Sequence, residues 1–211
     1  MAIDDLLDEH EQGERVRSWL RDNGAGLIGG VVLGLAIIGG WQWWQRQQQA
    51  QRIEVADRYQ SALEHIQSKQ LAQAQPLIAG LDGSAYATLA ALDLAKAQLD
   101  AGKGDDAIAT LQAARTQDPA LAAVVKQRQA RLLIDAGKAD EALQLLADQP
   151  EDADILEIRA DAQFALGRHD QARAAYEQAL TKLDVGAPQR RLVELKLSQA
   201  GGTPAKPEAQ S

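Results

Sequence analysis

The sequence predicts an all-α protein in which a single N-terminal transmembrane helix is followed by a solenoid of helical pairs. Residues 23–45 contain no acidic or basic side chain, although 25% of the whole chain is charged. Beyond them the chain is rich in Ala, Leu and Gln, with apolar residues at spacings of three and four, which is typical of helices. An alanine-centred motif recurs after 33, 35 and 30 residues, which is typical of stacked helical repeats.

Residues 1–22 form an acidic tail with a net charge of −4, half of the −8 of the whole chain. Its apolar residues fall at helical spacing on either side of Gly13. This pattern fits either an amphipathic helix in two stretches or a solvated tail. The acidic balance of the chain argues against nucleic acid as a partner, since phosphates require a basic surface.

Residues 23–45 have the length and composition of a membrane span. As a helix they extend about 34 Å, enough for a hydrocarbon core of about 30 Å. Tryptophan favours the membrane interface, and the apolar centre of the span, residues 27–38, is flanked by Trp19 on one side and by Trp41, Trp43 and Trp44 on the other. A cleaved signal peptide is the alternative, but bulky tryptophans occupy the region where a cleavage site needs small residues. We therefore expect a retained anchor.

The charges that flank the span do not decide its orientation. Three arginines lie within about 15 residues on each side. Arg21 lies directly at the boundary of a short tail, whereas long domains cross a membrane largely regardless of their charge. This favours a cytoplasmic amino terminus.

Three glycines of the span, Gly26, Gly30 and Gly34, are spaced by four residues and share one helix face. This arrangement lets a partner helix approach closely. It equally fits the general frequency of glycine in membrane helices. A helix of another protein or a second copy of this chain are both possible partners.

The repeat is visible in three aligned segments: AGKGDDAIATL at 101–111, AGKADEALQLL at 136–146 and LGRHDQARAAY at 166–176. A fainter copy without the glycine occupies 69–78. Glycine at 102, 137 and 167 falls where a first helix ends and the chain needs a left-handed conformation. Aspartate at 105, 140 and 170 is expected to cap the second helix.

Small residues mark where the paired helices cross. Two sets of alanines lie twelve residues apart in the four units, and we expect them to pack against each other. The sets are Ala62, Ala95, Ala130 and Ala160, and Ala74, Ala107, Ala142 and Ala172. This pattern resembles tetratricopeptide repeats over about residues 53–183, which implies a repeat domain over 46–199 with a closing helix at 188–199. The Gly- and Pro-rich residues 200–211 are expected to be a disordered tail.

Stacked helical pairs form an extended concave surface. Residues just after the packing alanine of each first helix, and one turn before it, should point into that surface. These are Lys96, Gln127, Arg131, Glu157 and Asp161. Their mixed charge suits a peptide or protein partner, or else they are ordinary solvated groups.

The sequence offers no catalytic constellation. Its histidines, His10, His65 and His169, lie in the tail, a helix and a turn, and it contains no cysteine. We therefore expect neither an enzyme nor a metal or other cofactor.

The whole arrangement resembles the YfgM family of ancillary subunits of the bacterial SecYEG translocon. The resemblance is carried by the acidic tail, the span ending in GGWQWW at 39–44, the Gln-rich connector and YATLAALDLA at 86–95. It implies a single-pass inner-membrane protein with a cytoplasmic amino terminus and a periplasmic repeat domain. The implied partners are SecYEG and the periplasmic chaperone PpiD, with secretory client chains as a further expectation. An envelope scaffold for cell-division or cytochrome-maturation complexes is the alternative function.

Overall fold

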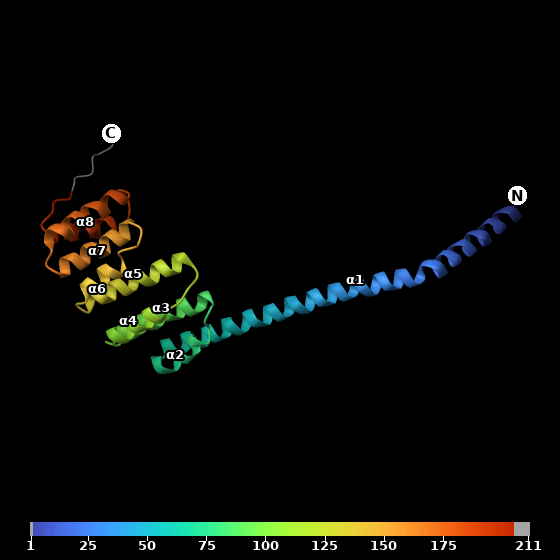
Figure 1. Cartoon of the computed structure of the whole chain (residues 1–211), viewed down its shortest axis with the longest axis horizontal. Helices are drawn as coiled ribbons and strands as arrows, with labels where there is room; N and C mark the ends of the chain where they lie inside the picture. Colours follow the sequence, from blue (N-terminus) through green and yellow to red (C-terminus); the bar gives the residue numbers. More distant parts are fainter. Residues whose placement is uncertain (1, 205–211) are drawn as a thin grey trace, which may run out of the picture. The chain divides into compact units, whose positions relative to one another are not determined.

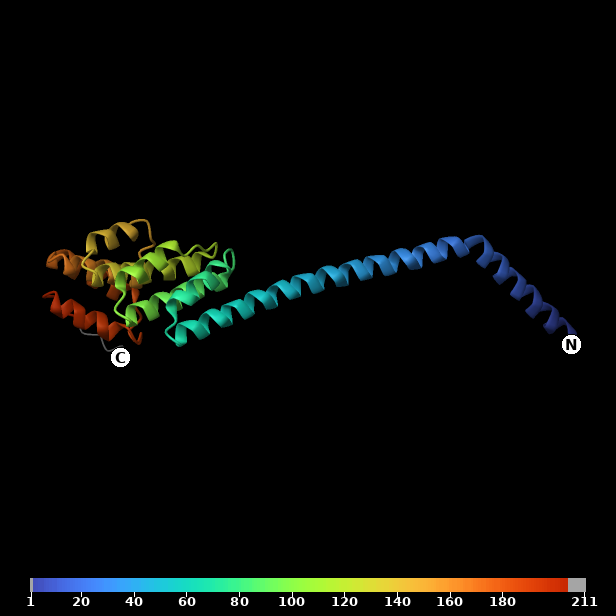
Figure 2. The same ribbon diagram turned by 90° about the horizontal axis from the view of Figure 1, so that it is seen from below.

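The computed structural model describes residues 2–204, with side chains from Gly13 onward. Every regular element in that range is a helix, and no strand occurs in it. The chain divides into two compact units at Glu54 and Val55. Figure 1 shows the helices, with labels on α1 to α8, and Figure 2 shows them from a second side. The all-helical prediction is confirmed.

Helix α1 (Ala2–Gln67) begins in the first unit and ends in the second. It is continuous at Gly13, where the sequence left room for a break. It also continues beyond the span, because residues 42–68 contain neither Gly nor Pro to end it. A single helix therefore includes the tail, the candidate span and the first helix of the repeat domain.

The second unit is a stack of helical pairs. The last turns of α1 pair with α2 (Leu71–Ala79), α3 (Ala85–Asp100) with α4 (Gly104–Ala113), and α5 (Pro119–Asp135) with α6 (Ala139–Leu145). The last pair, α7 (Ala153–Ala165) and α8 (His169–Lys182), is followed by α9 (Arg190–Gln199). Helices α3, α5 and α7 are the first helices of successive pairs, as Figure 1 shows.

The packing alanines and turn glycines behave as the sequence predicted. All eight alanines have at most 2% of their surface exposed, so the helices of each pair cross closely. Gly102, Gly137 and Gly167 have φ values of 73°, 74° and 73°. The first unit has no glycine at its turn, and Lys69 takes the left-handed conformation there with φ 60°.

The expected capping by the turn aspartates is wrong. Side chains of Ser84, Asp118 and Asp152 cap the first helices α3, α5 and α7. The second helices α4, α6 and α8 begin after Lys103, Lys138 and Arg168, with no side-chain cap. Each turn aspartate lies inside the first helical turn, where its charge favours the helix dipole and its carboxylate can reach a basic side chain. The aspartates are Asp105, Asp140 and Asp170.

Helix α9 closes the stack, as predicted for 188–199. Val193 and Leu197 are buried against α7 and α8 in a core that includes Ala160 and Tyr176. Packing continues past α9, because Ala200 is buried and the backbone N–H of Gly202 donates to the carbonyl of Leu197. Residues 205–211, the rest of the expected disordered tail, lie outside the described residues.

Candidate functional site

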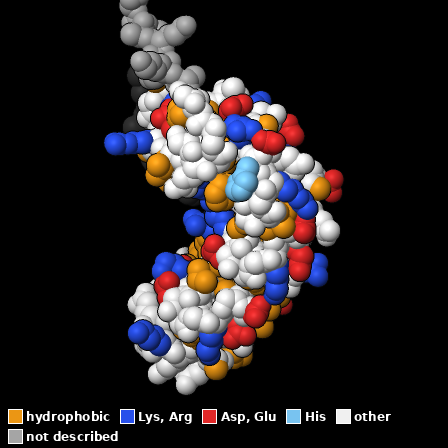
Figure 3. Space-filling view, turned by 90° about the vertical axis from the view of Figure 1, so that its left-hand side faces the viewer, with side chains coloured by type: hydrophobic (Ala, Val, Ile, Leu, Met, Phe, Trp, Pro, Cys, Tyr) orange, Lys and Arg blue, Asp and Glu red, His pale blue; other side chains and the backbone are white. Residues whose placement is uncertain are grey.

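The repeat domain is hollowed on one side. Figure 3 shows the hollow between the two ends of the domain, with Lys and Arg side chains gathered in it. Among the described residues, α3 and α5 line a groove with a volume of about 550 Å³. Its apolar lining includes Leu99 and Val124, which are 41% and 39% exposed. We call it the α3–α5 groove.

Charges of both signs surround the α3–α5 groove. Three cations and three carboxylates line it, namely Lys96, Arg128, Arg131, Asp93, Asp100 and Asp135. The ammonium of Lys96 donates to Asp100 at 2.6 Å, and both side chains are well exposed. An apolar lining beside charges of both signs suits an extended or helical protein segment with mixed polarity.

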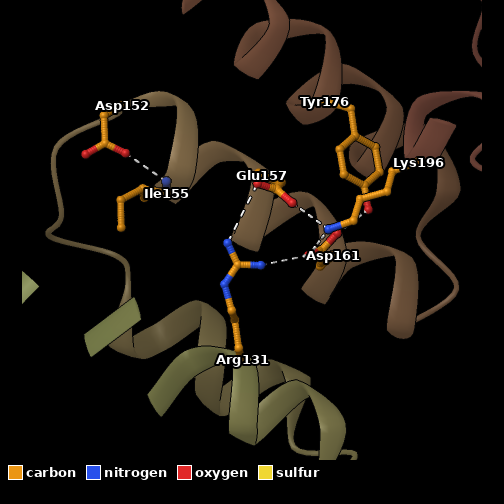
Figure 4. Close-up of polar contacts among 7 residues, drawn as sticks. All are labelled: Arg131, Asp152, Ile155, Glu157, Asp161, Tyr176 and Lys196. Atoms are coloured by element: carbon orange, nitrogen blue, oxygen red, sulfur yellow. Dashed lines mark hydrogen bonds and ion pairs between the residues drawn. The ribbon is translucent and has the colours of Figure 1, made fainter. Parts of the chain in front are cut away.

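A second cluster of charged groups lies among the helices α5, α7, α8 and α9 (Figure 4). The ammonium of Lys196 on α9 donates to Glu157 Oε1 at 2.6 Å and to Asp161 Oδ2 at 2.7 Å, both on α7. The guanidinium of Arg131 on α5 lies 3.7 Å from each of these carboxylates. Tyr176 on α8 donates its hydroxyl to Asp161 Oδ1 at 2.5 Å. These five residues form the inter-helix charge cluster.

The inter-helix charge cluster is balanced because two cations face two carboxylates. The Glu157 side chain is only 6% exposed, so an unpaired charge there would be costly. Burial raises the pKa of the Tyr176 phenol far above its ordinary value, and the Asp161 carboxylate raises it further. Tyr176 therefore remains a hydrogen-bond donor at any physiological pH.

The structure separates the five residues predicted for one concave surface. Lys96 and Arg131 line the α3–α5 groove, and their role in binding a partner stays a prediction. Glu157 is buried and already bound by Lys196, so its predicted exposure to a partner is wrong. Asp161 is engaged in the same cluster. Gln127 is half-buried on α5 and is not among the residues that line the α3–α5 groove.

Sequence reasoning missed the partners of these residues. Lys196 lies in the closing helix, outside the repeat, so the register of the repeat assigns it no inward face. Tyr176 ends the third aligned segment of the repeat, and its side chain belongs to the core with 2% of its surface exposed. Its hydroxyl could have been matched to a carboxylate, because a buried tyrosine needs a hydrogen-bond partner.

The described part of α1 contains a segment long and apolar enough to cross a membrane. Its large apolar side chains are exposed, from Leu27 to Ile38, and none of its most apolar window is buried. All four tryptophans are exposed, and the rings of Trp41 and Trp44 lie tilted against each other with centroids 5.4 Å apart. Such a continuous apolar surface is unfavourable in water and requires lipid or a partner.

The three glycines of the span contact no other part of the described chain through their Cβ side. A side chain added at Gly26, Gly30 or Gly34 would meet nothing within 4 Å. Their role in helix packing stays a prediction.

Across the described side chains, no group of three His, Cys, Asp or Glu residues is arranged to hold a metal ion. His169 is exposed at the start of α8 and lies against the ring of Phe164.

A family model described as a tetratricopeptide repeat-like domain matches residues 17–202. The chain belongs to this tetratricopeptide repeat-like family. The match covers the candidate span as well as the repeats.

Relatives match along nearly their whole length. A protein of Escherichia coli K12 named ancillary SecYEG translocon subunit is 29% identical over 90% of this chain and 95% of its own. A protein of the same name from Aggregatibacter actinomycetemcomitans is 27% identical over 91% and 97%. The resemblance to these translocon subunits is therefore confirmed. A solved kinesin light chain with tetratricopeptide-like repeats, from Podosopora anserina, is 19% identical over 70% of this chain and 84% of its own, with a TM-score of 0.49.

Proposed function

We propose that this protein is a non-enzymatic, membrane-anchored tetratricopeptide repeat subunit that associates with the SecYEG translocon. In this role α1 is the anchor and the repeat domain is the docking platform for a periplasmic chaperone of the PpiD type. The protein assists the biogenesis of secretory and envelope proteins through these contacts. Emerging client chains are a further class of ligand for the same surface.

The observation that carries the proposal is the full-length similarity to relatives named for the translocon. This similarity includes both α1 and the repeat domain, since about 90% of this chain is aligned. A repeat domain alone would be a weak guide, because one fold serves many partners. The exposed apolar surface of α1 adds an independent reason for a membrane location.

The α3–α5 groove is the proposed docking surface for the chaperone or client. Its volume of about 550 Å³ accommodates several side chains. Exposed Leu99 and Val124 supply apolar contact, and the surrounding charges of both signs supply orientation.

The proposed topology places the amino terminus in the cytoplasm and the repeat domain in the periplasm. A reporter that is active only outside the cytoplasm, fused after Ser211, should be active. The same reporter fused before Met1 should be silent. The reverse pair of results would contradict the orientation.

The proposed partners are tested by purification of the full chain from membranes in mild detergent. Recovery of SecYEG together with PpiD is expected. Recovery of cell-division or cytochrome-maturation proteins instead, without SecYEG, would support the envelope scaffold and overturn the proposal.

The α3–α5 groove is tested in the same purification by the double variant Leu99→Ser and Val124→Ser. These side chains are partly exposed, so the fold should tolerate the change. PpiD or client recovery should fall while SecYEG, held through the anchor, remains. Leu192→Ser on α9 is the control, because Leu192 is 51% exposed and does not line the groove. Equal recovery from the groove variant and the control would exclude this surface.

A further inference from the structure

The repeat turns carry a regular pattern of ion pairs. A basic residue follows each turn glycine, and an aspartate follows two residues later. Lys138 donates to Asp105 of the preceding repeat at 2.9 Å. Arg168 donates to Asp140 of the preceding repeat at 3.1 Å. The Asp105 carboxylate also raises the pKa of Lys138, as expected of a hydrogen-bonded pair. The basic residue of one repeat thus binds the aspartate of the repeat before it.

This pattern is incomplete at its amino-terminal end. Lys103 occupies the same turn position as Lys138 and Arg168, directly after its glycine. The residue of the first repeat that corresponds to Asp105 and Asp140 is Ala72. Within the described part of the chain, no ion pair includes Lys103. Lys103 therefore lacks the carboxylate that its two equivalents have.

Ala72 and Lys103 line one surface pocket, formed by the end of α1 together with α2 and α3. The pocket has a volume of about 750 Å³. Ile66, Leu71 and Ala97 give it an apolar lining. Lys69 is a second exposed cation in the lining, and it too has no ion pair within the described residues. We call this the first-repeat pocket.

The lining selects the chemistry of the occupant. A polyphosphate would be disfavoured, because Asp93 and Asp100 also line the first-repeat pocket and Lys96 is already bound to Asp100. A carboxylate is the group that the equivalent basic residues bind in the later repeats. The apolar lining of the first-repeat pocket favours an occupant that has apolar side chains next to that carboxylate.

We propose that the first-repeat pocket binds an acidic and apolar segment of a partner protein, whose carboxylate pairs with Lys103 at the place where the first repeat has Ala72. The first-repeat pocket shares Asp93, Lys96 and Asp100 on α3 with the α3–α5 groove, but the end of α1, α2 and Lys103 line the pocket alone. The proposal does not depend on which partner supplies the segment. The partner completes the ion-pair pattern of the turns, which the chain leaves open at one position.

Photocrosslinking in intact cells tests this proposal with the full chain. A photoreactive phenylalanine derivative replaces Gln73, which is exposed and lines the first-repeat pocket. We expect a protein adduct, mapped by mass spectrometry to a segment with Asp or Glu beside apolar residues. Lys103→Glu should lower the adduct yield about tenfold, which corresponds to about 1.4 kcal/mol. Lys182→Glu, an exposed charge reversal on α8, should leave the yield unchanged.

A second pair of variants separates pairing from folding. Ala72→Asp lies in the first turn of α2, where a negative charge favours the helix. It should supply Lys103 with a carboxylate from within the chain, so the adduct yield falls while the melting temperature is maintained. Ala72→Asn, of the same size without the charge, should keep the adduct. Exchange of the mapped acidic residue for Lys should restore the adduct with Lys103→Glu. Absence of an adduct, an adduct with lipid, or a yield indifferent to Lys103→Glu and Ala72→Asp would overturn the proposal.

Discussion

Replacement of Lys196 by Met should detach the closing helix without unfolding the rest of the stack. The substitution keeps the length of the side chain and its apolar stem but removes the ammonium that bonds to Glu157 and Asp161 at 2.6 and 2.7 Å. The two carboxylates on α7 then face each other with only Arg131, 3.7 Å away, as a counter-charge. Because both carboxylates belong to α7, the variant loses the two charged hydrogen bonds between α7 and α9 and leaves the carboxylates short of solvation, so the contact between these helices should open.

The magnitude follows from burial. Removal of one partner from a buried ion pair costs about 3–5 kcal/mol. Lys196 is 21% exposed, and Arg131 can move towards the carboxylates, so we expect a smaller loss of about 2 kcal/mol. This corresponds to a roughly 30-fold rise in the population of the opened state.

Hydrogen exchange of the full chain in detergent micelles measures this loss. Amides of α9 should lose about 30-fold in protection, whereas amides of α3 and α4 should change little, because repeats are stabilised mainly by their neighbours. Lys138→Met is the matched control. It removes an ion pair whose side chains are 42% and 86% exposed, and such pairs contribute about 0–1 kcal/mol.

A further variant distinguishes charge from shape. Glu157→Gln combined with Lys196→Met removes one of the two facing carboxylates and should recover part of the lost protection. Unchanged protection of α9 in Lys196→Met, or an equal loss in α3 and α4, would refute the role assigned to the inter-helix charge cluster.

Three other predictions concern packing, pH and the anchor. Ala142→Leu should destabilise the repeat domain by about 1–3 kcal/mol, because Ala142 is fully buried where α6 crosses α5; unchanged thermal melting would show that the register is wrong. The raised pKa of Tyr176 contributes stability that is complete below the ordinary tyrosine pKa of about 10 and is lost as pH rises above it. Urea unfolding between pH 9 and 11 should therefore show a shallower decline for Tyr176→Phe, and equal slopes would contradict this. Gly30→Leu with Gly34→Leu should lower SecYEG recovery while circular dichroism stays helical, and full recovery would exclude the glycine face as a contact.

The sequence was sufficient to predict the repeat and its register. Alanines at helix crossings and glycines at left-handed turns are constrained by sterics that leave few alternatives, so their positions are informative. The left-handed conformation of Lys69 could not be predicted in this way, because lysine has no preference for that conformation.

The candidate site was predicted only in part, because its contacts depend on distances between helices. Asp105 was expected to cap its own helix, but Lys138 of the next repeat lies within reach of its carboxylate. Glu157 was expected to face a partner, but Lys196, almost forty residues later, covers it. Long-range ion pairs of this kind cannot be derived from spacing within a repeat.

The proposed function requires that the anchored repeat protein binds the translocon. Purified full-length protein and purified SecYEG, each in detergent, can be reconstituted together in lipid nanodiscs and analysed by mass photometry after affinity capture through SecYEG. We expect particles that contain both proteins, at a frequency above that of random co-reconstitution with an unrelated single-span protein. A frequency equal to that control would contradict direct association with the translocon.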